Sequence, residues 1–235
     1  FWKALDNTIV YVLLVVIIRT VVGLGLALVL HRQTRLNMLL RIAFFLPSVT
    51  ASIAISVIWG WIFRGHSYGL INTVLLQTGL IQQPISFLAD ANWSMPVLVI
   101  MAVWGGIGYT MILFLAGLQN IPNEYFEAAA IDGANNSQSF WHLTLPLLRP
   151  TTVFVVVTGI IGAFQVFEPI YILFATSEGL GGVLDSALTV VPYLYDEGFR
   201  LFHLGYASAI AWILFIIIFA LTLINMRIGR VSEAY

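Results

Sequence analysis

The chain alternates between long apolar segments and shorter polar ones. Five apolar segments reach the roughly 20 residues that a helix needs to cross a bilayer. Runs of this length favour helices, since the strands of a membrane barrel alternate over about ten residues. We therefore predict an all-α integral membrane protein with five visible transmembrane helices, at Thr8–Leu30, Leu39–Phe63, Met95–Leu118, Thr151–Phe174 and Leu204–Met226.

The segments between these spans differ in character. Residues 31–38 form a short basic turn, and Pro47 interrupts the second span. Residues 64–94 and 175–203 are mixed, with apolar runs at Leu70–Leu76 and Ala187–Leu194. Both runs are too short to span a bilayer, so they predict interfacial or re-entrant helices.

Composition supports the membrane interpretation. The 235 residues are 60% hydrophobic and 9% charged, whereas a soluble domain carries about 25% charged residues. The net charge of -1 gives no basic stripe for nucleic acid. No cysteine is present, and the four histidines lie far apart in sequence, so we expect no metal site.

Basic residues predict the orientation. Cytoplasmic loops are enriched in arginine and lysine. If residues 31–41, residues 119–150 and the C-terminus share one side, that side holds Arg32, Arg35, Arg41, Arg149, Arg227 and Arg230. The opposite side holds Lys3, Arg64 and Arg200. The first side is therefore expected to be cytoplasmic, and the odd number of spans suggests a sixth helix ahead of Phe1 in the full chain.

The polar segment at residues 119–150 predicts a helix, a tight turn and a second helix. Glu124 and Glu127 fall in the first turns, where the helix dipole favours negative charge. The alanines that follow are strong helix formers with almost no side chain. Gly133 suits a left-handed cap, and a second short helix can start near Ser137. A bland alternative is an amphipathic loop that lies on lipid headgroups.

The spacing within this loop resembles a known signature. Glu127-Ala128-Ala129 is followed by Gly133 after three residues, and after nine more by Leu143, one residue and Leu145-Pro146. This pattern resembles the "EAA" loop of ABC importer permeases, where isoleucine is usual in place of Leu143. The flanking Ile131-Asp132-Gly133-Ala134 and Pro150 are similar to the carbohydrate branch, which includes permeases for maltose-like oligosaccharides and glycerol phosphate. The resemblance covers most of the chain.

The resemblance implies a role for the loop and a set of partners. In that family the loop is a coupling helix that docks in a groove of a separate ATPase. The expected assembly comprises this chain, a second and different permease subunit, two ATPase subunits and an external solute-binding protein, in a bacterial or archaeal cytoplasmic (inner) membrane. Residues 1–235 would form one transmembrane domain containing the coupling loop 119–150. The coupling residues would be Glu127, Ala128, Ala129, Asp132, Gly133, Leu145 and Pro146.

A separate observation agrees with an ATPase that is a different polypeptide from this chain. A P-loop requires a lysine after its glycines, and the only lysine here is Lys3, which lies in no such context. We therefore expect no cofactor in this chain, with ATP and magnesium bound by the partner, and no enzymatic chemistry of its own.

Polar groups within the apolar spans are candidates for the solute pathway, because they usually face a cavity. The fourth span carries Gln165 and Glu168, which would share a helix face with Gly162. Phe164, Phe167 and Tyr171 form a neighbouring aromatic stripe, whose flat apolar faces could bind sugar rings. The predicted pathway comprises Tyr109, Gly162, Phe164, Gln165, Phe167 and Glu168. The glycines could equally serve packing, and Arg19 could snorkel or pair with a neighbouring helix.

Two other functions were weighed. A secondary transporter or channel driven by an ion gradient usually needs ionisable relays within the membrane, and only Arg19 and Glu168 qualify. A membrane-bound enzyme would need a catalytic constellation, which the sequence does not suggest. An ATP-driven importer that moves a sugar or sugar-like solute inward by alternating access is the interpretation that the loop favours.

Overall fold

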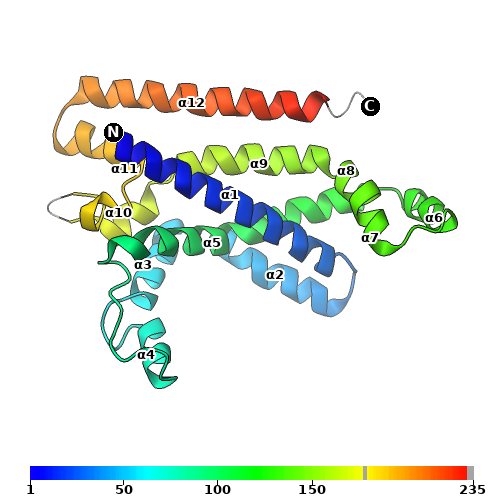
Figure 1. Cartoon of the computed structure of the whole chain (residues 1–235), viewed down its shortest axis with the longest axis horizontal. Coiled ribbons are helices and arrows are strands. Elements are labelled where there is room, and N and C mark those ends of the chain that lie inside the picture. The colour runs from blue at the N-terminus through cyan, green and yellow to red at the C-terminus, as the bar shows by residue number, and fades with distance from the viewer. Residues whose placement is uncertain (177–178, 232–235) are drawn as a thin grey trace.

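The computed structural model describes residues 1–176 and 179–231. Its long helices are α1 (Trp2–Leu30), α5 (Ala91–Gln119), α9 (Arg149–Phe164) and α12 (Leu204–Val231), which run alongside one another (Figure 1). Among the described residues, four helical stretches are long and apolar enough to cross a membrane, with Arg149–Phe174 counted as one of them. A bent pair of helices is the fifth candidate. The prediction of an all-α membrane protein is confirmed.

The second predicted span is broken. Residues Leu39–Phe63 were expected to form one interrupted helix, but α2 (Arg35–Val49) and α3 (Ser52–Ile62) meet at 99°. Pro47 lies inside α2, and the chain leaves the helix three residues later, where the Thr50 amide donates to the Pro47 carbonyl. Since proline has no N–H to donate to the preceding turn, it weakens the helix just before this bend.

The fourth predicted span is also interrupted. Helix α9 ends at Phe164, and α10 (Glu168–Phe174) begins after three non-helical residues. The expectation that Gly162, Gln165 and Glu168 share the face of one continuous helix is therefore wrong. Pro169 is the second residue of α10, where its fixed φ and missing N–H suit a helix start.

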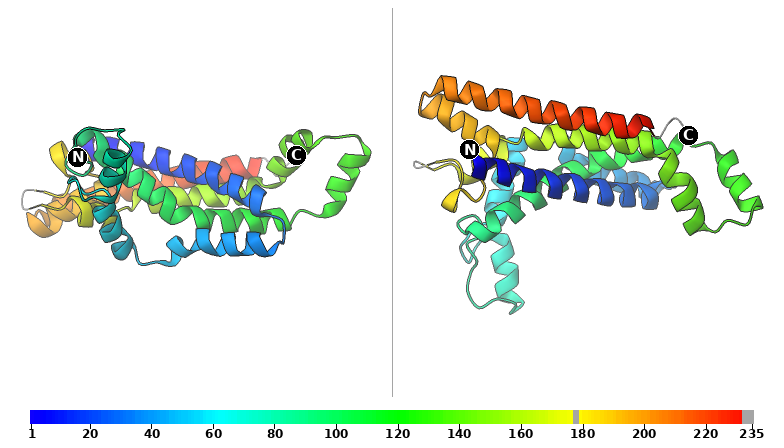
Figure 2. Two further views of the ribbon diagram at one scale, coloured as in Figure 1. Left: turned by 90° about the horizontal axis from the view of Figure 1, so that it is seen from below. Right: turned by 45° about the horizontal axis from the view of Figure 1, so that its top comes forward.

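Shorter elements occupy the two ends of the bundle. The predicted helices in the mixed segments are present as α4 (Leu70–Gln77) and α11 (Val190–Tyr195). The remaining elements are α6 (Asn123–Ile131), α7 (Asn136–Ser139), a π-helical turn at Phe140–Thr144, α8 (Leu145–Leu147), a 3-10 turn at Val183–Asp185 and a π-helical turn at Asp196–Arg200. Figure 2 shows α6 and α7 projecting from one end of the bundle and the α4 lobe projecting near the other.

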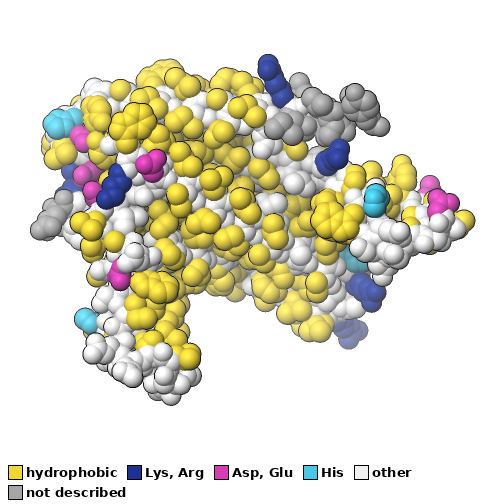
Figure 3. Space-filling model, viewed as in Figure 1, with side chains coloured by type: hydrophobic (Ala, Val, Ile, Leu, Met, Phe, Trp, Pro, Cys, Tyr) yellow, Lys and Arg dark blue, Asp and Glu magenta, His cyan; other side chains and the backbone are white. Residues whose placement is uncertain are grey.

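Apolar and charged side chains are distributed over the surface as a bilayer requires. Apolar side chains cover the middle of the face in Figure 3, while charged side chains gather towards the two ends. Large apolar residues such as Ile17 on α1 and Trp212 on α12 are exposed. Water would make such a belt costly, whereas lipid accommodates it.

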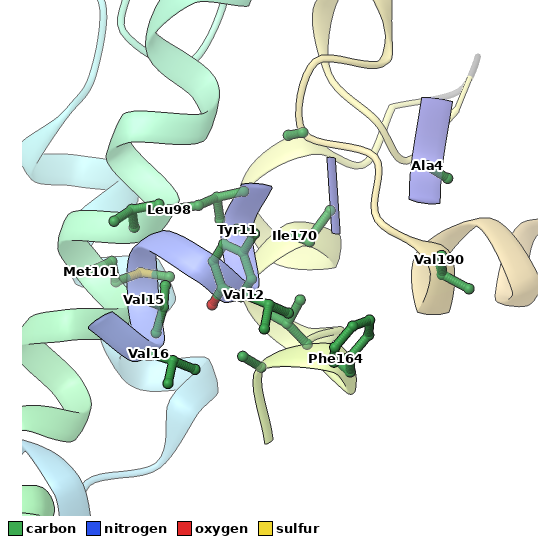
Figure 4. Close-up of a cluster of buried hydrophobic side chains, with 14 of the residues drawn as sticks. Ala4, Tyr11, Val12, Val15, Val16, Leu98, Met101, Phe164, Ile170 and Val190 are labelled. Atoms are coloured by element: carbon green, nitrogen blue, oxygen red, sulfur yellow. The ribbon is translucent and has the colours of Figure 1, made fainter. Parts of the chain in front are cut away.

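The core forms where α1 packs against α5, α9 and the α10–α11 region. Tyr11, Val12 and Val15 of α1 face Leu98 of α5 and Phe164 at the end of α9 (Figure 4). A second cluster near the other end joins α1, α5 and α9. These two clusters fix α1, α5 and α9 against one another. The projecting loop connects α5 to α9, and predicted pathway residues lie on α5 and at the end of α9.

Candidate functional site

The projecting loop begins as a short helix with a small-residue surface. Helix α6 starts directly after Pro122 and carries Glu124 in its first turn, as the helix dipole favours. Glu127 and Ala128 are exposed, and Ala129 is partly exposed. An exposed surface of alanine lets another protein approach the backbone closely.

Gly133 ends α6 in a Schellman motif. Its φ of +78° lies in the left-handed region that favours glycine. The Ala134 amide donates to the Ala129 carbonyl at 2.9 Å, and the Gly133 amide donates to the Ala130 carbonyl at 3.1 Å. Asp132 is the cap residue that precedes the turn. The predicted left-handed turn at Gly133 is confirmed.

The loop returns to the bundle through a second short helix, α7, whose start is fixed by two hydrogen bonds. Asn135 and Gln138 form a reciprocal capping box, with amide-to-side-chain distances of 2.9 and 2.8 Å. The π-helical turn follows, and it closes with the Leu145 amide donating to the Phe140 carbonyl. Pro146 comes directly after it in α8 and has no amide to extend the ladder.

Both stems of the loop are anchored in the bundle. Ile121 and Leu148 are buried in the cluster that includes Phe114 of α5. Gly117 permits this closeness, because a Cβ there would lie 2.5 Å from Thr151 Oγ1 at the start of α9. A displacement of the loop would therefore be transmitted to α5 and α9.

The loop also exposes large apolar side chains. Ile131, part of the loop signature, is 86% exposed at the end of α6, and Tyr125 and Trp141 are also exposed. Tyr125 was missed, since its only sequence signal is its position among polar residues, outside every apolar span. Together with the alanines they make a surface with the character of a protein interface.

One group of predicted pathway residues lies between α1, α5 and α9. Tyr109 on α5 is 44% exposed. Beside it is a cavity of about 10 Å³ with a mixed lining, to which Arg19 and Thr20 of α1 and Thr158 of α9 contribute polar side chains. Arg19 pairs with the neighbouring helix, since its Nε donates to Thr110 Oγ1 at 3.4 Å.

The other predicted pathway residues gather at the break between α9 and α10. Gln165 lines a groove of about 420 Å³ whose opposite wall is α12. Gly162 and Glu168 are exposed, and Phe167 is partly buried. The structure thus brings Gln165, Phe167 and Glu168 together at one break in the helix and places Tyr109 with Arg19 instead.

Phe164 differs from the rest of the predicted pathway. Its side chain is 3% exposed and packs in the main core. The predicted aromatic stripe of Phe164, Phe167 and Tyr171 is therefore divided. Phe167 and Tyr171 join Tyr195 and Phe199 in a row of rings with centroids 5.0–5.7 Å apart. Tyr195 and Phe199 were missed, although their spacing of four residues places them on one helix face.

A polar network supports the nearby turn into α12. The His203 Nδ1 lies 2.8 Å from Glu197 Oε2, and the Tyr193 hydroxyl donates to that of Tyr206 at 3.3 Å. The hydrogen bond with His203 holds the pKa of Glu197 below its ordinary value, although desolvation opposes this. Desolvation raises the pKa of Tyr193, and its hydrogen bonds to Tyr206 and Glu197 raise it further.

A helical bundle with an apolar belt and an anchored loop at one end defines a membrane protein with several spans. The family model described as "Binding-protein-dependent transport system inner membrane component" matches residues 19–233. The chain belongs to this family, and it is a multi-pass membrane protein.

Curated relatives agree along almost the whole chain. The probable ABC transporter permease protein YesP of Bacillus subtilis is 39% identical over 97% of this chain and 72% of its own length. The arabinooligosaccharides transport system permease protein AraP of the same organism is 36% identical over 97% of this chain and 72% of its own length. The lactose transport system permease protein LacF of Rhizobium radiobacter is 34% identical over 98% of this chain and 76% of its own length.

A solved structure shows the same fold. A chain in the crystal structure of a bacterial alginate ABC transporter, in complex with an alginate pentasaccharide-bound periplasmic protein, superposes with a TM-score of 0.87. It is 22% identical, and the match covers 99% of this chain and 80% of that one. The prediction of a carbohydrate-type ABC permease on the strength of the loop motif agrees with these findings.

Proposed function

We propose that this chain is the permease subunit of an ATP-driven importer that moves a sugar or sugar-like solute inward by alternating access. The observation that carries the proposal is the loop of α6 and α7, with Glu127, Ala128 and Ala129 at its surface and both stems anchored in the bundle. The transport of arabinooligosaccharides and lactose named for AraP and LacF supports the solute class.

The proposed assembly has the partners that such a loop requires. A separate ATPase binds ATP and magnesium and receives the loop at Glu127, Ala128, Ala129, Asp132 and Gly133. Leu145 and Pro146 hold the return helix. Two ATPase subunits, a second and different permease subunit and an extracytoplasmic binding protein complete the importer.

We infer the membrane orientation from the number of arginines at each end of the bundle. The start of α2, the α6–α8 loop and the end of α12 lie at one end (Figure 1), and this is the end with more arginine. We place it in the cytoplasm of a bacterial cell. The named relatives are bacterial, so they do not support the archaeal alternative.

The proposed pathway runs past two sites. Tyr109 faces the solute between α5 and α9, and Gln165, Phe167, Glu168 and Gly162 face it at the α9–α10 break. Phe164 is left out of the pathway because its side chain is buried in the core.

Co-purification from the native host tests the proposal. A tag on this chain should retrieve an ATPase, a second permease subunit and a binding protein, identified by mass spectrometry. Retrieval of the chain with no ATPase, under mild detergent conditions that keep other importers intact, would contradict it.

A further inference from the structure

Arg19 carries a positive charge deep inside a membrane helix. It lies three residues from the midpoint of the 29-residue helix α1, which corresponds to about 4.5 Å along the axis. A charged side chain at such depth is costly and usually serves a function or has a named partner. Figure 1 shows the central part of α1 beside α5 and α9, the two long helices that it contacts most.

The neighbours of Arg19 leave its charge uncompensated. Among the side chains that the structure describes, its one hydrogen-bond partner is Thr110, at 3.4 Å, whereas a guanidinium has five N–H donors. Among the side chains of residues 1–176 and 179–227, the ion pairs within 4.0 Å are Arg200–Asp196 and His203–Glu197, both at the turn into α12. No carboxylate of the described chain therefore neutralises Arg19.

The helix opposite is shaped to hold the guanidinium across the bundle. A Cβ at Gly106 would lie 2.3 Å from the Arg19 Cζ, so the guanidinium packs directly against the α5 backbone in the space that this glycine leaves. Thr110, one turn further along α5, is the hydrogen-bond partner. The side chain therefore packs against α5 rather than extending along α1 towards the membrane surface.

The space around the guanidinium is small, and its lining mixes polar and apolar side chains. Thr20, Tyr109 and Thr158 line it together with Arg19, and its volume is about 10 Å³, which is roughly the room for one water. Helices α1, α5 and α9 each contribute to the lining, so their separation during transport would open the site. Tyr109, already placed on the pathway, lies at the edge of the same cavity.

We propose that Arg19 is an anion-recognising residue of the translocation pathway and that the solute is an acidic saccharide. This inference rests on the proposed function, because it names the solute class of the same importer. A guanidinium binds a carboxylate or another oxyanion through two parallel hydrogen bonds, and a charge pair of this kind is strong where water is excluded. A neutral sugar would leave the charge unpaired.

The test uses the complete importer in ATP-containing liposomes, supplied with its binding protein. The liposomes receive a mixture of neutral and uronic-acid oligosaccharides of two to four units, and mass spectrometry identifies what enters. We expect uronic-acid oligosaccharides to accumulate. Arg19→Met should lower kcat/KM for them roughly ten- to hundredfold, the loss expected for hydrogen bonds to a charged group. Arg19→Lys, which keeps the charge, should retain much of the transport.

Gly105→Ala is the control for a change on α5 that leaves the charge site intact. A Cβ there would meet no atom within 4 Å, so Arg19 and Thr110 stay in place and uptake of the acidic solute should stay near that of the unmodified importer. Uptake of neutral oligosaccharides alone by the unmodified importer would overturn the inference, and this result needs no variant to fold. Equal uptake of acidic solute by Arg19→Met would also overturn it. A complex without ATP-dependent uptake of any saccharide would instead refute the proposed function.

Discussion

At the scale of single residues, Gly133 is the position where local geometry and proposed function meet most closely. A side chain there would meet no atom within 4 Å, so space is not what requires glycine. The φ of +78° is the constraint, because a left-handed conformation costs an ordinary residue about 1–2 kcal/mol, and a β-branched one is a clear outlier.

Gly133→Val is therefore expected to disturb the loop while the membrane helices stay intact. The strain should reduce the fraction of correctly shaped loops roughly five- to thirtyfold, with a matching loss of ATPase retrieved on the tagged chain. Quantifying the bound ATPase by mass spectrometry, alongside expression in the membrane, checks this.

The chain offers a matched control for this substitution. Gly79, just after α4 at the other end of the bundle, has a φ of +72° and no neighbour within 4 Å of a Cβ. Gly79→Val imposes a similar backbone strain away from the coupling loop. If Gly133→Val retained as much ATPase as Gly79→Val, the α6–α8 loop would not be the contact with the ATPase.

The residue scale also shows which site features the sequence could reveal. The glycine turn and the exposed alanines were predictable, because cap chemistry and motif spacing are local. The burial of Phe164 was not, and for Arg19 the sequence left snorkelling and pairing with a neighbouring helix open. The outcome depends on which helix each side chain faces, and helices that are apolar on every side carry no pattern that reports it.

At the scale of the elements, glycine governs how closely the helices approach. A Cβ at Gly108 on α5 would lie 2.0 Å from the carbonyl oxygen of Phe44 on α2. Backbone cannot rotate away as a side chain does, so α2 would have to move. At Gly105 on the same helix, a Cβ would meet nothing within 4 Å.

Gly108→Ala and Gly105→Ala should thus have opposite effects on stability. The first overpacks the α2–α5 contact and is expected to cost about 1–3 kcal/mol. The second replaces a helical glycine in open space and should gain up to about 1 kcal/mol. Thermal unfolding midpoints of the purified subunit measure both, and a Gly108→Ala midpoint at or above that of the unmodified chain would contradict the close approach.

The elements also show where prediction from sequence fails. Apolar length located every span, because a bilayer imposes that length on any helix crossing it. It could not show that α3 turns 99° away from α2 or that α9 stops at Phe164. Both breaks lie close to a proline, which signals an interruption but not the angle that tertiary packing then selects.

At the scale of the whole molecule, the two ends of the bundle have different tasks. The α6–α8 loop at one end is anchored to α5 and α9, and these helices also line the cavity at Arg19. At the other end, the buried Asn72 fixes the α4 lobe through hydrogen bonds to the Arg64 and Ile85 carbonyls. A movement imposed at the loop can thus reach the cavity through continuous helices.

The most direct test of this account is the energy source of transport. The assembled importer, in liposomes with ATP on the side of the α6–α8 loop and binding protein on the other, should accumulate solute only with hydrolysable ATP. Ionophores that collapse proton and sodium gradients should leave the initial rate unchanged. Uptake that continues without ATP and stops when the ionophores are added would identify a gradient-driven transporter and contradict the account.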